Sequence, residues 1–351
     1  MVALYVTSSE PYSGKTLTCL VLGMRWQREG RRVGYFKPLG LAPISVEGQT
    51  TDEDAHFVAQ QLGLTTSPAD LCPVILTREV CHANQEELRN RVREAYSRAS
   101  AEKEIMLVGA LGPVLSRGAM VGLDQPKLAE LLDLKVLLVG RCQSFLDADS
   151  IIASARALGD RVVGVILNRV PAQREDEIWD DVVPCLETLG VTVLGLLPDD
   201  PVLQSVSVRE LVEALGGELL CGEASLEYLV ENFVVGAMGV DRALRYFRRT
   251  PRKCVITGGD RSDIQLAALE TPTRCLILTG HLRPSPQVLA RAQELQVPVI
   301  LVRDDTLSTV STIDEMLGRL RVRERRKIDH AIDQFEGRLD LEKLDAALGL
   351  T

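Results

Sequence analysis

Short apolar runs that alternate with amphipathic segments are the feature of this chain that most restricts its fold. Residues 136–139 (VLLV), 162–167 (VVGVIL) and 193–197 (VLGLL) are apolar at successive positions, as in strands that bury both faces. Residues 148–158 and 179–189, which lie between them, have the apolar spacing of helices. Buried strands separated by helices predict an α/β fold, with a parallel sheet and helices on both of its faces.

The same alternation occupies most of the chain. In the N-terminal part we expect further strands at 3–7, 32–36 and 104–108 and helices at 17–29, 52–62, 86–101 and 127–132, with Thr51 or Asp52 capping the second helix. Later we expect strands at 218–221, 254–257, 275–278 and 297–302 and helices at 207–215, 240–248, 260–269 and 286–294. From residue 308 onward the pattern is helical.

A chain of 351 residues exceeds what one hydrophobic core usually serves. We therefore predict a first α/β domain at 1–205, a smaller α/β domain at 206–315 and a C-terminal helical segment at 316–351. The hydrophobic fraction of 46% is that of an ordinary globular protein.

The charge and cysteine content indicate which partners and which cellular compartment to expect. A net charge of −9 repels polyanions, so we expect no nucleic-acid partner, and we interpret the basic run at 319–327 as a solvated helix face. The eight cysteines form no C-x-x-C pair and most lie inside apolar segments, which indicates buried thiols in a reducing compartment. With no basic leader and no apolar stretch of about 18 residues, the sequence predicts a cytoplasmic protein without a membrane partner.

A phosphate-binding loop is predicted at Ser13, Gly14, Lys15 and Thr16, between an expected strand and an expected helix. Glycine lets backbone amides close around phosphate oxygens, and the helix N-terminus adds partial positive charge. Lysine reaches the β- and γ-phosphates, and the threonine hydroxyl binds Mg²⁺. Ser9 stands where the motif has its first glycine, so a helix start that happens to carry Gly-Lys-Thr is the alternative.

The segment 6–16, VTSSEPYSGKT, resembles the leading motif of the dethiobiotin synthetase family, with Ser8 in place of a glycine. The resemblance implies that Lys37, in VGYFKP, contacts an acidic substrate and is catalytic together with Lys15. It also implies that Asn168 reads the nucleobase of ATP or a related nucleotide. A surface lysine before a turn and an asparagine at a turn are the alternatives for Lys37 and Asn168.

The same resemblance implies a Mg²⁺ site formed by Thr16 and Asp54. The family has a further acidic ligand in a V-E-G-A-G-G segment, and Val108 replaces that acid here. Phosphoryl transfer depends on metal-ion charge, so we expect nucleotide binding with weak or no turnover. Asp54 as a residue that only favours a helix N-terminus is the alternative.

The second domain is very similar to the DRTGG domain, whose name residues correspond to Asp241 and Arg242 and then to Thr257, Gly258 and Gly259. With Asp260, which we expect to cap the next helix, these are candidate ligand-binding residues. A βα turn that needs glycine only for its geometry is the alternative.

A dethiobiotin-synthetase-like domain followed by a DRTGG domain resembles the N-terminal part of long bacterial phosphate acetyltransferases. The residues after 315 are too few for an acetyltransferase domain, so we expect no acetyltransferase activity from this chain by itself.

The leading hypothesis is a nucleotide-binding regulatory or sensor protein. The alternatives are an ATP-dependent carboxylate-activating ligase, of the dethiobiotin synthetase or cobyrinic acid diamide synthase type, and a non-catalytic partner subunit of an acetyltransferase. By family analogy we expect a homodimer or higher homo-oligomer.

Overall fold

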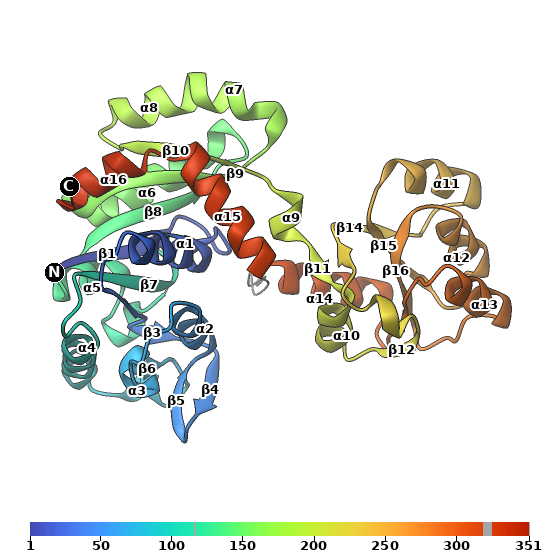
Figure 1. Cartoon of the computed structure of the whole chain (residues 1–351), viewed down its shortest axis with the longest axis horizontal. Helices are drawn as coiled ribbons and strands as arrows, with labels where there is room; N and C mark the ends of the chain where they lie inside the picture. Colours follow the sequence, from blue (N-terminus) through green and yellow to red (C-terminus); the bar gives the residue numbers. More distant parts are fainter. Residues whose placement is uncertain (116, 319–324, 351) are drawn as a thin grey trace. The chain divides into compact units, whose positions relative to one another are not determined.

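The computed structural model describes residues 1–115, 117–318 and 325–350 (Figure 1). The chain packs as two compact units. The first unit contains residues 1–199 and 321–351, and the second unit contains residues 200–320.

The first unit is built on a six-stranded parallel sheet with the order β10-β9-β8-β1-β7-β2. Its strands are β1 (Val2–Ser8), β2 (Val33–Phe36), β7 (Ile105–Pro113), β8 (Lys135–Arg141), β9 (Val162–Val170) and β10 (Val193–Pro198). Most of their side chains are buried on both faces of the sheet. This confirms the parallel α/β sheet that the continuous apolar runs predict.

Helices cover both faces of this sheet (Figure 1). One face packs on α4 (Gln85–Ala99), α5 (Gln125–Leu131), α6 (Ala148–Leu158) and α8 (Val183–Thr188). The other face packs on α1 (Lys15–Arg28), α15 (Arg325–Arg338) and α16 (Leu341–Leu348). The segment before α8 is less regular than expected, since α7 (Glu175–Glu177) leads into a π-helical turn at Ile178–Val182.

The connection after β2 contains small elements that the sequence pattern does not predict. They are β3 (Leu39–Gly40), β4 (Pro43–Val46), β5 (Gln49–Asp52), α2 (Glu53–Gln61), α3 (Pro68–Leu71) and β6 (Val74–Ile75). Of these, only α2 is expected from the sequence. The antiparallel hairpin of β4 and β5 delivers Asp52 to the start of α2, where it caps the helix as expected.

The C-terminal helices belong to the first unit. Asp345 on α16 accepts hydrogen bonds from Arg25 (2.6 Å) and Trp26 (3.0 Å) on α1. Beside β10, Asp340 donates its amide to the Leu194 carbonyl (2.7 Å). The boundaries 1–205, 206–315 and 316–351 stay predictions, and most of the basic run at 319–327 lies outside the described residues.

The second unit contains a five-stranded sheet with the order β12-β17-β16-β15-β14. Its strands are β12 (Glu218–Cys221), β14 (Asn232–Val235), β15 (Lys253–Gly258), β16 (Thr273–Thr279) and β17 (Val299–Leu301), of which β12 is antiparallel to its neighbour. The helices are α9 (Pro201–Gln204), α10 (Val208–Leu215), α11 (Val240–Arg249), α12 (Ser262–Leu269), α13 (Pro286–Glu294) and α14 (Thr306–Gly318). A two-residue pairing joins β11 (Val206–Ser207) to β13 (Leu229–Val230).

Helix hydrophobicity and cysteine burial are two further features of the structure. Within the described ranges, no helix combines the length and the apolar character that crossing a membrane requires. Of the seven cysteines whose side chains are described, all but Cys185 are buried, in agreement with the expectation of buried thiols.

Candidate functional site

The loop between β1 and α1 has the left-handed turn that a phosphate-binding loop needs. Gly14 has φ 96° at the N-cap of α1, and Tyr12 has φ 56°. Neither Ser8 nor Ser9 has a positive φ, so serine causes no backbone strain at the positions where the related motifs have glycine. The hydroxyls of Ser8 (2.7 Å) and Ser13 (2.8 Å) both donate to the Glu10 carbonyl and hold the loop closed.

One hydroxyl of the loop is left without a protein partner. The Oγ of Ser9 is buried and has no hydrogen bond in the structure. A buried polar atom without a partner costs free energy, and at a binding loop this points to a ligand atom as the partner. The loop residues present therefore fit a phosphate-bearing ligand.

Lys15 lies in a half-buried and electropositive position. Its Nζ donates to Ser8 Oγ (3.0 Å). Burial lowers the pKa of Lys15 to about 8, and the charges of Lys37 and Arg117 act in the same direction. The lowered pKa shows that the surroundings do not fully stabilise the positive charge of Lys15. An anion beside Lys15 would supply the missing negative charge.

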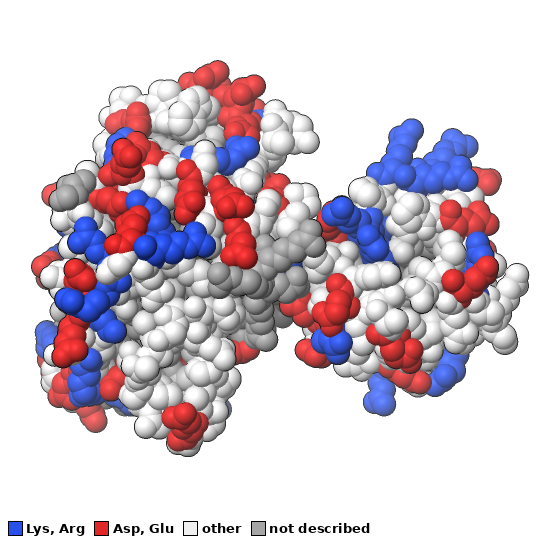
Figure 2. Space-filling view, viewed as in Figure 1, with Lys and Arg blue, Asp and Glu red and all other residues white. Residues whose placement is uncertain are grey.

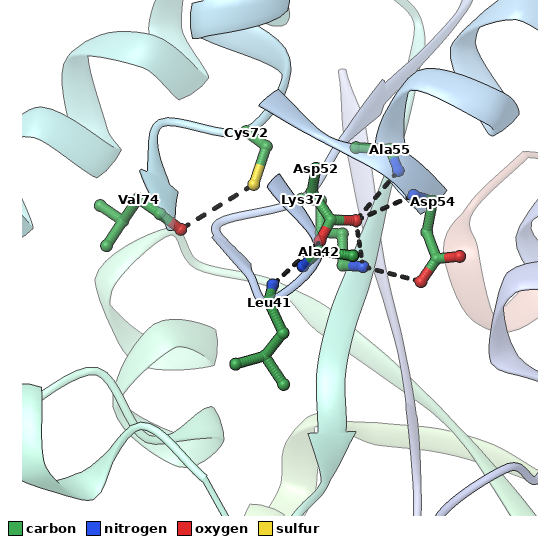
Figure 3. Close-up of polar contacts among 8 residues, drawn as sticks. All are labelled: Lys37, Leu41, Ala42, Asp52, Asp54, Ala55, Cys72 and Val74. Atoms are coloured by element: carbon green, nitrogen blue, oxygen red, sulfur yellow. Dashed lines mark hydrogen bonds and ion pairs between the residues drawn. The ribbon is translucent and has the colours of Figure 1, made fainter. Parts of the chain in front are cut away.

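Lys37 does not extend freely toward a substrate position. Its Nζ lies 2.6 Å from Asp52 Oδ1 and 3.1 Å from Asp54 Oδ2 (Figure 3). Burial acts to lower the pKa of Lys37, but Asp54 and Asp52 outweigh it and the pKa is raised. Lys37 is therefore a charged lysine that forms a buried ionic cluster with two carboxylates.

Asp52 is the centre of this cluster, and sequence reasoning identifies it only as a helix cap. Its Oδ1 accepts from the amides of Asp54 and Ala55, and its Oδ2 accepts from the amides of Leu41 and Ala42 (Figure 3). Burial acts to raise the pKa of Asp52, yet Lys37 and these amides lower it. The signal available in the sequence was an acid at the head of a helix that follows a lysine-bearing strand end.

The predicted metal ligands are only partly assembled. Asp54 contacts Lys37, and Thr16 lies in the first turn of α1. Val108, at the position where the related family has an acid, is fully buried in the core of the sheet. Over residues 1–115, 117–318 and 325–350, no group of three or more histidine, cysteine, aspartate or glutamate side chains is placed to hold a metal ion.

Asn168 is brought directly to the phosphate loop. Its Nδ2 donates to the Ser13 carbonyl (2.8 Å), and its Oδ1 accepts from the Arg169 amide (2.8 Å). A Cβ atom on Gly14 would lie 2.7 Å from Asn168 Nδ2, so glycine is needed there for this approach as well as for its φ. Sequence reasoning missed Arg169 and also Arg141, although both stand at the ends of apolar strands.

In the second unit, the glycine turn of the DRTGG motif joins β15 to α12. Thr257 is buried, and its hydroxyl donates to the Gly236 carbonyl (3.2 Å). A Cβ atom on Gly259 would lie 1.7 Å from the Leu282 carbonyl oxygen, so only glycine fits. Gln265 Nε2 donates to the Gly258 carbonyl (2.8 Å), and these contacts brace the turn.

The charged residues of the motif lie on the surface. Asp241 and Arg242 are exposed in the first turn of α11, a helix that also carries Arg245, Arg248 and Arg249 and over which basic side chains gather (Figure 2). The expectation that Asp260 caps α12 is wrong, because the helix begins at Ser262 and Arg261 takes the N-cap position. Arg261 instead forms an ion pair with Asp263 (3.0 Å) and donates to the Met238 carbonyl (3.4 Å).

Two curated phosphate acetyltransferases are similar to almost the whole of this chain. The phosphate acetyltransferase of Nitratidesulfovibrio vulgaris is 27% identical over 371 residues, covering 98% of this chain and 51% of that protein. The phosphate acetyltransferase of Synechocystis sp. is 25% identical over 360 residues, covering 97% of this chain and 51% of that protein. The chain thus spans about half the length of these curated relatives.

Among solved structures, the chain is similar to that of the CBS and DRTGG domains of the regulatory region of Clostridium perfringens pyrophosphatase, complexed with the activator diadenosine tetraphosphate. The identity is 26% and the TM-score 0.28, with 30% of this chain and 45% of that chain covered.

Family models divide the chain in the same way. A model described as DRTGG domain matches residues 210–316, and a model described as AAA domain matches residues 2–207. The second match covers more than half of the sequence and includes the phosphate loop, Lys37 and Asn168. The chain therefore belongs to this AAA domain family and carries a DRTGG domain in its second unit.

Proposed function

We propose that the first unit binds ATP or a related nucleotide at the phosphate loop, and that the chain is a regulatory or sensor protein with weak or no turnover. The observation that carries the proposal is a contrast within one site. The phosphate loop holds Lys15 half-buried in electropositive surroundings, whereas the position of the expected acid is occupied by the fully buried Val108.

The phosphates would be bound by the loop amides of residues 13–16 and by Lys15. Asn168, which contacts the loop from β9, would lie beside the nucleoside. Thr16 and Asp54 would hold Mg²⁺, which supplies charge stabilisation to the phosphates when it is bound. Lys37 and Asp54 already form an ion pair at 3.1 Å, so a metal ion and Lys37 compete for the same carboxylate.

The test is nucleotide binding measured by isothermal titration with ATP, ADP, GTP and cyclic dinucleotides, with and without Mg²⁺. We expect binding that the Lys15→Ala variant loses and that Lys127→Ala, which alters an exposed lysine of the same unit, retains. Phosphate release in the same samples should stay at background. Absence of binding by every nucleotide would contradict the proposal.

An ATP-dependent carboxylate-activating ligase is the second candidate. It is favoured by the convergence of Lys37 and Asp54 near the carboxyl edge of the sheet. Phosphate or ADP release that rises severalfold on adding a carboxylic acid would support the ligase and exclude the sensor without turnover.

The third candidate is a non-catalytic partner subunit of an acetyltransferase. It is favoured by the similarity to phosphate acetyltransferases over almost the whole of this chain. Co-purification of this chain with an acetyltransferase would support it. Light scattering with and without nucleotide measures the homodimer or higher oligomer that all three candidates include.

A further inference from the structure

Two arginines stand at the carboxyl ends of neighbouring strands beside the phosphate loop. Arg141 ends β8, and in the parallel register it lies opposite Asn168 of β9, which directly precedes Arg169. Asn168 holds the Ser13 carbonyl of the loop. The strand order places β8 and β9 on one side of β1 and places β7 and β2, which leads to Lys37, on the other. The two arginines are thus separated from the Lys37 cluster by the loop itself.

Both arginines are half-buried, and each lies beside Asn168, Arg141 across the strand pair and Arg169 along the chain. Burial lowers the pKa of Arg169, and the positive charge of Arg141 lowers it further, an effect larger than the opposing attraction of Asp199. Arg141 donates to the side-chain oxygen of Gln143 (2.7 Å), which is a neutral acceptor. Placing two like charges together costs free energy, and a bound anion offsets that cost.

A third guanidinium approaches the same place. Arg174 donates to the backbone oxygen of Gln143 (3.3 Å), so Arg141 and Arg174 meet at the two ends of this one residue. Arg174 also lies 4.0 Å from Glu177 and is therefore partly compensated. A bound anion would therefore be attracted most strongly by Arg141 and Arg169.

The backbone at Arg169 is strained. Its φ of 56° is in the left-handed region, which is unfavourable for a long side chain. The amide of Arg169 donates to Asn168 Oδ1 (2.8 Å), and this bond holds the strained turn against the residue that contacts the phosphate loop. Strained backbone of this kind persists where the surrounding structure fixes it, commonly at binding sites.

We propose that Arg141 and Arg169 form a second anion site. It binds a phosphate group of the nucleotide that lies outside the polyphosphate held by the phosphate loop. The inference rests on the proposed function, because the loop anchors the other end of the ligand. Guanidinium groups bind phosphate through paired hydrogen bonds and suit such a site. The ligand class is a nucleotide with phosphates at two separate positions.

Two kinds of nucleotide have this chemistry, and the experiment separates them. Titrations would use ADP, adenosine 3′-phosphate 5′-diphosphate and a cyclic diadenylate, whose two phosphates are at separate positions, with the wild-type chain and with Arg169→Gln and Arg141→Gln. Arg156→Gln is the matched control, because Arg156 is exposed on α6, the helix that follows β8. Thermal unfolding of each variant verifies that it is folded.

We expect at least one doubly phosphorylated probe to bind roughly tenfold or more tightly than ADP, and Arg169→Gln and Arg141→Gln to remove this gain while ADP affinity changes less than about twofold. A gain limited to the 3′-phosphate probe identifies a ribose phosphate, and a gain limited to the cyclic diadenylate identifies a cyclic dinucleotide. If ADP binds in a Lys15-dependent manner and neither probe gains affinity, this inference is wrong and the proposed function stands. If the arginine variants weaken ADP as much as the probes, the second anion site is likewise excluded. Absence of any nucleotide binding overturns both.

Discussion

The ammonium group of Lys37 lies 2.6 Å from the carboxylate of Asp52, and the two side chains are only 7% and 1% exposed. A buried ion pair is a weak source of net stability, but removing one partner leaves the other charge buried without compensation. Forming the cluster therefore adds little net stability, whereas removing one of its charges is strongly destabilising. This penalty keeps the connection between β2 and α2 in place.

Replacing Lys37 by methionine should destabilise the first unit by about 3–5 kcal/mol, because the Asp52 carboxylate stays buried. Urea denaturation measures the loss, and the double variant Lys37→Met/Asp52→Leu should recover a large part of it. The control is Lys127→Met, which breaks a surface ion pair with Asp124 at 2.9 Å and should cost less than about 1 kcal/mol. Similar losses for Lys37→Met and Lys127→Met would contradict the buried-pair interpretation.

The free energy of unfolding should depend on pH because the pKa values of Lys37 and Asp52 are both shifted in the folded state. The folded-state pKa of Asp52 is lowered, so its contribution is present above the unfolded value of about 4 and is lost as the pH falls through the folded pKa. The folded-state pKa of Lys37 is raised, so its contribution is present below about pH 10.4 and is lost as the pH rises through the folded pKa. Urea midpoints measured against pH should show both losses, and the acidic loss should be smaller in Asp52→Asn.

Nucleotide affinity should fall as the pH rises from 7 to 9. The Lys15 ammonium, with its pKa lowered to about 8, is mostly charged at pH 7 and mostly neutral at pH 9. If only the charged form binds phosphate, the affinity falls roughly tenfold over this range, and binding at pH 8 takes up protons. Titration in buffers of different ionisation enthalpy measures the uptake. In Lys15→Arg the pH dependence should disappear, since guanidinium stays charged.

Asp345→Ala should loosen the C-terminal helix from α1. The substitution removes acceptors for Arg25 and Trp26, and we expect a loss of about 2–3 kcal/mol. Hydrogen exchange should rise in α16 and in the last turn of α1. Glu336→Ala is the control, because Glu336 forms an exposed 3.6 Å ion pair with Arg28 and its loss should lie within about 1 kcal/mol.

In the second unit, Gly259→Ala should destabilise the fold by about 3 kcal/mol or more, because its Cβ meets the Leu282 carbonyl oxygen. Gly239→Ala is a matched control, since Gly239 has a φ of −69° and no atom within 4 Å of an added Cβ. Thermal unfolding of the two variants gives the comparison. Equal stability would mean that the glycine turn tolerates a side chain.

The sequence predicts the sheet well because each strand of a buried parallel sheet is apolar over its whole length. Periodicity alone locates β8, β9 and β10 and the helices between them. The resemblance to dethiobiotin synthetase selects Lys15, Lys37 and Asn168, and the structure places Lys15 and Asn168 in contact with loop residues.

The parts that sequence reasoning missed depend on contacts between distant residues. The partner of Lys37 is Asp52, and the intervening hairpin of β4 and β5 is too short and too polar to give a clear period. The binding of α16 to α1 joins residues more than 300 positions apart. Asp260 was expected to cap α12 from local pattern alone, and the later start of the helix made that prediction wrong.

The return of α15 and α16 to the first sheet makes the order of synthesis matter for this chain. The ribosome completes residues 200–320 before it releases the helices that cover α1 and β10. Until then one face of the nascent sheet lacks part of its cover, and apolar surface of that kind attracts chaperones and other nascent chains. The second unit has time to fold first, and the first unit is completed only after the second has been synthesised.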